Sequence, residues 1–252
     1  VGAWPIDADR LAAYLTKAVR EAKQHTSWTD PDPVYEQALD AWVRNALSDV
    51  DFTDDVDRFV SGILRPGWVN SLSQKLLTLT APGVPDLYQG SELWDWSLVD
   101  PDNRRPVDYE LRRRLLAEVQ QADAARLWAD EDGSGRSKLA LVQRALACRT
   151  RQPEAFAGGY EPLMATGAAA EHVVAFCRGA AAVTVVCRLP LGLEEKGGWS
   201  DTAIELPNGT WLDVVNDEKW SGEVRLESLL SGFPVALLER QNTAVSREGG
   251  GR

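Results

Sequence analysis

The residues most able to do chemistry are concentrated between Ala81 and Tyr109. A group of carboxylates shares this stretch: Asp86, Glu92, Asp95, Asp100 and Asp102. Retaining glycoside chemistry requires two carboxyl groups about 5 Å apart, one acting as nucleophile and the other as acid. The alternative is that these carboxylates are hydrogen-bonding partners that hold a loop together, as acids beside arginines often do. The residue types alone leave both roles open.

Other side chains in this stretch suit a sugar. Tyr88 and Gln89 follow Asp86 almost directly; a glutamine amide can donate to and accept from sugar hydroxyls, and a tyrosine ring can support a glucose face. Packing at the rim of a site is an equally good explanation for both. In the run DPDNRRP, Arg104 and Arg105 can pair with neighbouring acids and rigidify the loop, or one of them can hold a sugar.

A second group of candidates follows the first predicted helix: Lys23, His25, Thr26 and Trp28. A helix end, a run of polar side chains and a tryptophan together suit the wall of a sugar-binding subsite. A structural histidine with satisfied hydrogen bonds is the alternative for His25. The other histidine, His172, begins a predicted strand, and we expect it to be structural.

Helices are predicted on both sides of these candidates. Periodic apolar residues indicate helices over residues 7–23, 32–47 and 54–64, a fourth opened by Pro66 and ended near Thr80, and two more over 108–128 and 138–151. Asp7, Asp32 and Asp108 are the expected N-caps. The basic cluster of residues 112–114 is expected on a solvated helix face among acids.

The apolar run from Val84 to Tyr88 is predicted to be a buried strand that leads into a long loop, residues 90–107. Helix, Pro-Gly turn, apolar strand and long loop is the order expected where a helix of a β/α barrel returns to the last parallel strand. Asp86 would then point from the C-terminal end of that strand, where barrel active sites form. Loops of this length are usually functional or disordered, and Trp94 and Trp96 argue against disorder.

From Tyr160 onward the pattern changes to that of an antiparallel β domain. HVVAFCRG, AAVTVVCRLPL, EVRLESLL and PVALLER are short runs with strand character. Asn208-Gly209 between strand-like flanks predicts a hairpin turn. The end of the chain, SREGGGR, is expected to be disordered.

Composition excludes several classes of function. The chain has 38 acids and 27 bases, a net charge of −11, so no nucleic-acid partner is expected. Three cysteines fit no metal spacing and two histidines make a zinc site improbable, so we expect reduced thiols, although Cys177 and Cys187 fall on neighbouring predicted strands. No metal and no cofactor are expected. No signal peptide or membrane-spanning run is recognisable, which favours a cytoplasmic protein with no membrane partner.

Particular runs of the sequence are more informative than its composition. The run PGVPDLYQGSELWD followed by DPDNRRPVD resembles the eighth-strand region of the maltooligosyltrehalose synthases, a family in the α-amylase superfamily. VGAWP, REAKQHTSW, AAEHVVAFCRG and VCRLPLGLEEKGGW agree with it along nearly the whole chain. The resemblance implies a mixed α/β and all-β fold: the C-terminal part of a (β/α)8 barrel, then an antiparallel β-sandwich.

The expected domains are residues 1–155 for the barrel part with its helical segment, 156–245 for the β domain and 246–252 for the tail. A whole barrel needs about 250 residues, and this chain of 252 residues also holds a β domain. We therefore expect a C-terminal piece of a larger enzyme.

The resemblance also implies an activity for the parent protein. It is an isomerase that converts the reducing-end α-1,4 bond of a maltooligosaccharide to an α,α-1,1 bond by intramolecular transglycosylation. In the family the catalytic carboxylates come from earlier barrel strands, and none of the five acids above matches them. We therefore expect no catalytic residue here, no activity from this chain alone, and two partners: the maltooligosaccharide and the missing N-terminal part of the polypeptide.

Other classes of function remain as alternatives. One is a non-catalytic carbohydrate-binding domain that uses Trp199, Trp211 and Trp220, and another is a purely structural domain. A self-contained hydrolase using Asp86 and Glu92 is the least favoured.

Overall fold

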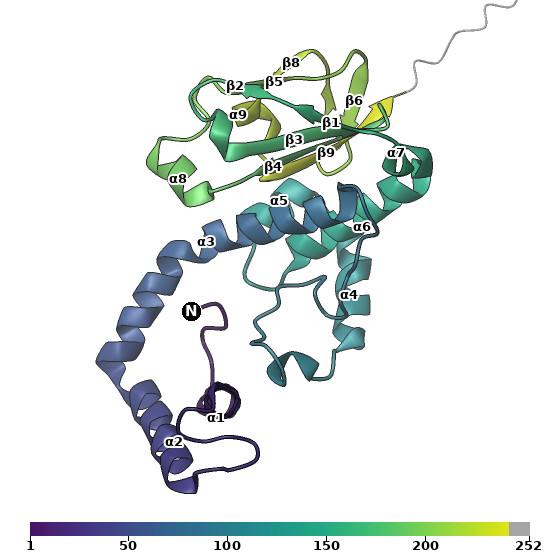
Figure 1. The fold of residues 1–252 in the computed structure, drawn as a ribbon. Helices are drawn as coiled ribbons and strands as arrows, with labels where there is room; N and C mark the ends of the chain where they lie inside the picture. Colours follow the sequence, from purple (N-terminus) through teal and green to yellow (C-terminus); the bar gives the residue numbers. More distant parts are fainter. Residues whose placement is uncertain (242–252) are drawn as a thin grey trace, which may run out of the picture. The chain divides into compact units, whose positions relative to one another are not determined.

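A computed structural model describes residues 1–241 of the chain and divides it into two compact units. The helical unit comprises residues 1–65 and 95–107, and the sheet unit comprises residues 66–94 and everything described from 108 onward. The elements of both are shown in Figure 1. The candidate residues are divided between the two units, so each unit is described by itself.

The helical unit is built on α1 (Ala8–Ala22), α2 (Pro33–Ser48) and the first half of α3 (Val50–Thr80). Two predicted N-caps are confirmed here: Asp7 accepts a hydrogen bond from the backbone of Arg10, and Asp32 accepts from those of Val34 and Tyr35. Each cap satisfies N–H groups that have no partner inside the helix. Helices α1 and α2 pack against each other.

Helix α3 corrects the prediction of two helices separated at Pro66. It is a single helix of 31 residues with Pro66 inside it. A proline removes one helical hydrogen bond and bends the axis, but it does not have to end a helix whose flanks are otherwise favourable. The second half supplies such a flank, because Leu72, Leu76 and Leu79 are fully buried in the sheet unit. The boundary between the units falls between Arg65 and Pro66.

The strand predicted from Val84 to Tyr88 is absent. Between α3 and α4 the chain forms loop, interrupted by a single 3-10 turn, η1 (Asp102–Arg104). Val84 is 96% exposed instead of buried. A strand exists through hydrogen bonds to a neighbouring strand, and no described strand pairs with this segment.

Helices of the sheet unit follow the loop: α4 (Tyr109–Val119), α5 (Ala124–Ala129), α6 (Arg136–Arg151) and α7 (Pro153–Ala157). The predicted cap at Asp108 is confirmed, since its carboxylate accepts from the backbone N–H of Leu111 at 2.8 Å. The helix predicted over 108–128 is interrupted, because Asp123 caps α5 as a separate helix. A small apolar core joins these helices to the end of the loop: Leu93, Leu115, Val119, Leu139 and Ala140.

Nine strands complete the sheet unit: β1 (Tyr160–Leu163), β2 (Ala165–Thr166), β3 (Val173–Arg178), β4 (Ala182–Cys187), β5 (Ala203–Glu205), β6 (Thr210–Asp213), β7 (Lys219–Trp220), β8 (Glu223–Arg225) and β9 (Val235–Gln241), the count covering residues 1–241. They form one sheet in the order β1-β3-β4-β9-β6-β7 and another in the order β2-β5-β8. Every pairing is antiparallel, as predicted. Both sheets contribute to one core, for example Val185 and Leu238 from the first and Ile204 and Val224 from the second, which is the packing of a sandwich. Two short helices, α8 (Pro190–Glu195) and α9 (Leu226–Leu229), lie between strands in the sequence (Figure 1).

The hairpin predicted at Asn208-Gly209 is wrong. Its flanking strands belong to different sheets, β5 to the three-stranded sheet and β6 to the six-stranded one. The turn therefore carries the chain from one sheet to the other. Gly209 has a φ of +134°, and the guanidinium of Arg240 donates to the carbonyl of Asn208 at 3.0 Å. A turn-forming dipeptide fixes the local bend but not the sheet that the chain enters next.

The thiols and His172 are buried. Cys177 and Cys187 lie on the paired strands β3 and β4, as expected, but Cys177 faces Val183 in the register, and no cysteine among the described residues is in a disulfide. Burial raises the pKa of Cys187 to about 11. His172 ends the 3-10 turn η2 (Ala170–His172) before β3 and packs its Nδ1 against two backbone carbonyls. The predicted tail, 246–252, lies outside the described residues.

Within residues 1–241, none of the helices combines the length and the apolar character that crossing a membrane would require.

Candidate functional site

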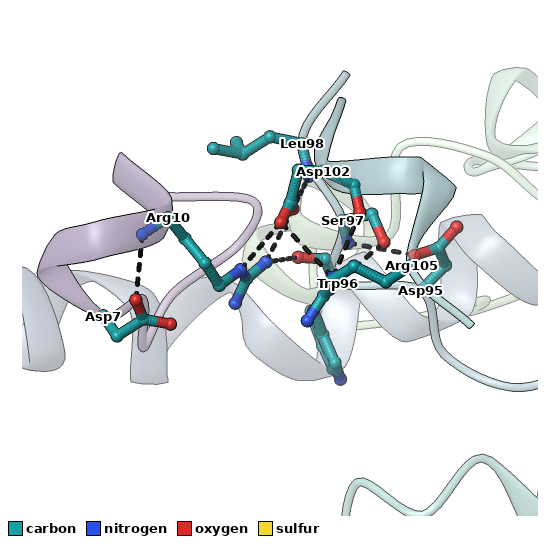
Figure 2. Close-up of polar contacts among 8 residues, drawn as sticks. All are labelled: Asp7, Arg10, Asp95, Trp96, Ser97, Leu98, Asp102 and Arg105. Carbon is teal, nitrogen blue, oxygen red and sulfur yellow. Dashed lines mark hydrogen bonds and ion pairs between the residues drawn. The ribbon is translucent and has the colours of Figure 1, made fainter. Parts of the chain in front are cut away.

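Asp102 fastens the long loop to helix α1 (Figure 2). The guanidinium of Arg10 donates from Nε to Asp102 Oδ1 at 2.9 Å and from Nη2 to Oδ2 at 2.8 Å. The backbone N–H of Leu98 donates to Oδ2 at 2.7 Å, and Arg10 also donates to the carbonyl of Trp96. The hydrogen bonds from Arg10 lower the pKa of Asp102 to about 2. This carboxylate is therefore ionised, and its oxygens are occupied by the protein.

Arg104 and Arg105 also pair with acids of their own loop. Arg104 pairs with Asp100, and Arg105 donates to the backbone carbonyl of Asp102 at 3.0 Å. Lys17 from α1 donates to the carbonyl of Asp100 at 2.6 Å. These contacts hold the loop together, which is the structural role considered for the two arginines from the sequence. Their side chains remain 71% and 53% exposed, which leaves N–H groups facing solvent.

Thr26 lies at the centre of a second network in the helical unit. Its hydroxyl donates to Glu36 Oε1 at 2.7 Å and accepts from the backbone N–H of Asp32 at 3.0 Å. Arg20 donates to both oxygens of Glu36, and these hydrogen bonds, together with the one from Thr26, lower the pKa of Glu36 to about 2. Thr26 is only 2% exposed, so its contribution in this structure is to hold the connection between α1 and α2.

Trp28 is the most open aromatic side chain of this connection. It is 58% exposed, and the guanidinium carbon of Arg20 lies 5.0 Å from the centroid of its ring. A cation over an indole restrains the ring and leaves the remaining surface for a ligand. His25 is exposed, with its ring centroid 5.1 Å from that of Tyr35. Lys23 is the exposed C-cap of α1, with a left-handed φ of 54°.

The remaining candidates belong to the sheet unit. Gln89 accepts a hydrogen bond at Oε1 from the hydroxyl of Tyr109 at 3.1 Å. Asp86 and Tyr88 are exposed. Lys75 on α3 donates to the hydroxyl of Ser91 at 3.3 Å. Burial lowers the pKa of Lys75, against the opposing charges of two nearby acids.

Arg112 corrects the expectation of a fully solvated basic cluster. Its side chain is 18% exposed and forms an ion pair with Glu92. It also donates to the backbone carbonyl of Gly90 at 2.9 Å. Arg112 therefore ties the segment after Gln89 to helix α4, while its neighbours Arg113 and Arg114 are exposed as predicted.

The structure brings the candidates together in two groups. Lys23, His25, Thr26, Trp28, Arg104 and Arg105 belong to the helical unit, and Asp86, Tyr88 and Gln89 belong to the sheet unit. Sequence reasoning missed four partners: Arg10, Lys17, Arg20 and Glu36. The spacing of Arg10 and Lys17, two helical turns apart on one face of α1, is the signal that points both at the loop.

Four of the five clustered acids have a basic side chain or a backbone N–H as their partner. Asp100 and Asp102 pair with bases, Glu92 pairs with Arg112, and Asp95 accepts from the backbone N–H of Ser97 at 2.9 Å. Ion pairs and caps of this kind stabilise loops, whereas a glycosidase centre holds two carboxyl groups facing one substrate bond. The arrangement supports the structural role for these acids.

Comparison with known proteins agrees with the resemblance in the sequence. Over 249 residues the chain is 40% identical to the maltooligosyl trehalose synthase assigned in Mycobacterium tuberculosis, strains CDC 1551 and H37Rv. It matches the solved structure of the maltooligosyltrehalose synthase of Arthrobacter ramosus with a TM-score of 0.86 and 40% identity over 95% of the chain. This chain matches the C-terminal portion of maltooligosyltrehalose synthases. Another solved maltooligosyl trehalose synthase matches with a TM-score of 0.75 at 28% identity.

The match covers nearly all of this chain but a minority of each relative. It takes in 96% of the chain and 30% of the length of the Mycobacterium tuberculosis proteins, and 31% of the Arthrobacter ramosus synthase. Both units described above therefore fall within the part shared with maltooligosyltrehalose synthases. No family model matches the chain.

Proposed function

We propose that this chain is the C-terminal part of an enzyme that isomerises maltooligosaccharides. The whole protein would move the reducing-end glucose from an α-1,4 to an α,α-1,1 linkage by intramolecular transglycosylation, as the resemblance implies. The observation that carries the proposal is the 40% identity, with a TM-score of 0.86, over 95% of the chain. The expected substrate is a maltooligosaccharide, and the expected compartment is the cytoplasm.

In this proposal residues 1–155 complete a (β/α)8 barrel and residues 156–245 form the β domain behind it. The exposed segment from Val84 to Tyr88 supports the first part. Its apolar side chains, and backbone groups that pair with no described strand, would become a barrel strand once the preceding strands of the polypeptide lay beside it. The missing N-terminal part is therefore the principal partner of this chain.

The chain alone should be inactive. Retaining chemistry needs a nucleophile and an acid on opposite sides of one bond, and the acids of the loop are engaged in ion pairs and caps. The test is the conversion of maltopentaose by the 252-residue chain and by the longer native polypeptide, followed by chromatography of the products. Turnover by the short chain that Glu92→Gln abolishes would overturn this part of the proposal.

Within the whole enzyme, we assign the exposed candidates to retention of the released glucose. Each unit is assigned its own sugar contacts. In the helical unit Trp28 would form a wall, with Arg104 or Arg105 as a polar contact, and in the sheet unit Gln89 would bind hydroxyls through its amide, with Asp86 as a further polar contact. Excluding water from the glycosyl intermediate favours transfer over hydrolysis. Trp28→Ala or Gln89→Ala in the full enzyme should raise free glucose relative to the isomerised product. An unchanged product ratio in both variants would remove this role.

The alternative of a carbohydrate-binding β domain loses its proposed contacts. Trp211 is fully buried, and Trp199 and Trp220 pack against the sandwich core. Trp211 therefore presents no stacking surface, and Trp199 and Trp220 use part of their rings to pack against the core. A purely structural β domain is the better alternative, and a glucan affinity that Trp199→Ala abolishes would reverse that preference.

A further inference from the structure

A cavity in the sheet unit is lined by none of the nine candidate residues. It is bounded by α4, α6 and the segment of β6 and its following turn, and has a volume of about 250 Å³. Its lining residues are Gln120, Gln143, Arg144, Ala147, Arg151, Leu212, Val214 and Asp217. Pockets for drug-sized molecules measure about 300–1,000 Å³. The cavity therefore suits something smaller, of the size of one sugar ring.

The walls of the cavity are fixed by hydrogen bonds. Arg144 donates to the carbonyl of Val215 and, at 2.6 Å, to that of Ala122 just beyond α4. Arg151 donates to Glu239 on β9 at 2.6 Å. Helix α6 is thus joined to the turn after β6, to the end of α4 and to the sheet. Such a preformed space costs little reorganisation when a ligand enters.

Three polar side chains of the lining are unengaged. Among residues 1–241, the amides of Gln120 and Gln143 and the carboxylate of Asp217 form no hydrogen bond with another residue. Each amide offers two donors and an acceptor, and the carboxylate offers acceptors only. Together they match hydroxyl groups, each of which both donates and accepts.

The charges around the cavity balance. The guanidinium groups of Arg144 and Arg151 are offset by the carboxylates of Asp217 in the lining and Glu239, the ion-pair partner of Arg151. A phosphate or another anion would meet Asp217 and gain no net positive field. The aliphatic side chains of Leu212 and Val214 supply the apolar surface against which the C–H face of a sugar packs.

We propose that this cavity binds one hexose unit of a neutral saccharide. The inference rests on the cavity alone and holds whether or not the parent enzyme has the activity proposed above.

Maltose and glucose titrated into the isotopically labelled 252-residue chain test the site by heteronuclear NMR. Binding in the millimolar range should shift the backbone amides of Gln143, Ala147 and Leu212 together. Gln143→Leu removes one amide without changing helix preference greatly and should weaken maltose binding about tenfold. The matched control is Gln74→Leu on α3, an exposed glutamine of another helix in the sheet unit, which should leave the affinity unchanged.

Three results would overturn the site. They are maltose shifts confined to other residues, an unchanged affinity in a folded Gln143→Leu, and inorganic phosphate shifting the same amides at lower concentration than maltose. Circular dichroism establishes folding of each variant. Gln120→Leu, at the exposed end of α4, provides the same test if Gln143→Leu does not fold.

Discussion

The helical unit and the sheet unit differ in what fills the space between their elements. In the described helical unit the buried apolar side chains are Ala3, Ala12 and Val43. The sheet unit instead encloses a continuous sandwich core that includes Trp211 and Leu238. Buried apolar area is the main favourable contribution to folding. The sheet unit therefore has the means to be stable by itself, and the helical unit depends on polar contacts.

Exposed apolar side chains of the helical unit point the same way. Val34 is 78% exposed, Trp42 62% and Phe59 57%. Single exposed apolar residues are ordinary, but here they accompany a very small buried set. If the same kinds of substitution change the stability of both units equally, the two units do not differ in this way.

The largest effect is expected from Trp211→Ala. Trp211 is fully buried, and its Nε1 donates to the carbonyl of Pro207 at 2.8 Å. Replacing a buried tryptophan with alanine costs about 3–5 kcal/mol of unfolding free energy. Urea unfolding followed by circular dichroism measures it. Trp42→Ala in the helical unit is the control and should change stability by less than about 0.5 kcal/mol; equal losses would contradict the comparison.

The stability of the two units should depend on pH in opposite directions. Burial in the sheet unit raises the pKa of Asp213 to about 7, above its ordinary value near 4. The folded state keeps a proton that the unfolded state has lost, so the stability of the sheet unit should fall as pH rises from about 4 to about 7. Asp213→Asn should flatten this dependence in urea unfolding at a series of pH values, and a dependence that persists would remove Asp213 as its cause.

In the helical unit the pKa values of Asp102 and Glu36 are lowered to about 2 by their arginine partners. The stability that they contribute should be complete above about pH 5 and lost as pH falls toward 2. The backbone N–H of Leu98 donates a hydrogen bond to Asp102. Its hydrogen-exchange rate therefore reports on the helical unit separately. Full protection of that amide at pH 2.5 would contradict the expectation.

A smaller loss is expected from Arg10→Ala. It leaves the largely buried Asp102 without its guanidinium and should cost about 1.5–3 kcal/mol, the range for hydrogen bonds to charged groups. Faster hydrogen exchange at Leu98 is the sensitive measurement. Arg10→Lys keeps the charge but not the bidentate geometry. Its exchange rate at Leu98 should lie between those of the unchanged protein and of Arg10→Ala. Equal exchange rates in all three proteins would remove the role of this contact.

The smallest effect is expected from Arg44→Ala. Arg44 bonds to Asp9 and Asp40, and these contacts raise its pKa, but its side chain is 51% exposed. Exposed ion pairs contribute little because water screens them and the side chains lose freedom. The midpoint of urea unfolding should not move measurably. A clear shift would mean that surface pairs also support the helical unit.

Local features of this fold could be predicted, and contacts between distant segments could not. The caps at Asp7, Asp32 and Asp108 follow from residues within three positions of each other. The partner of Asp102 is 92 residues away. The spacing of Arg10 and Lys17 places both on one face of α1, but no local pattern identifies the loop as their partner.

Two of the wrong predictions, the strand over Val84 to Tyr88 and the hairpin at Asn208-Gly209, have the same origin. Val84 to Tyr88 has the composition of a strand, but a strand also requires a neighbour, which composition cannot supply. Asn208-Gly209 has the composition of a hairpin turn, and the turn forms. Which sheet receives the next strand is decided by the sandwich core, in which Ile204 and Trp211 come from the two different sheets.

The chain passes between the two units at three places: after residues 65, 94 and 107. Removing residues 1–65 would therefore not release a clean β-rich protein, because the loop 95–107 would remain and Asp102 would have no Arg10. A minimal version should delete both segments and rejoin residue 94 to residue 108 through a few glycines. In genetic terms, the helical unit is encoded in two pieces, and a single cut in the gene cannot excise it.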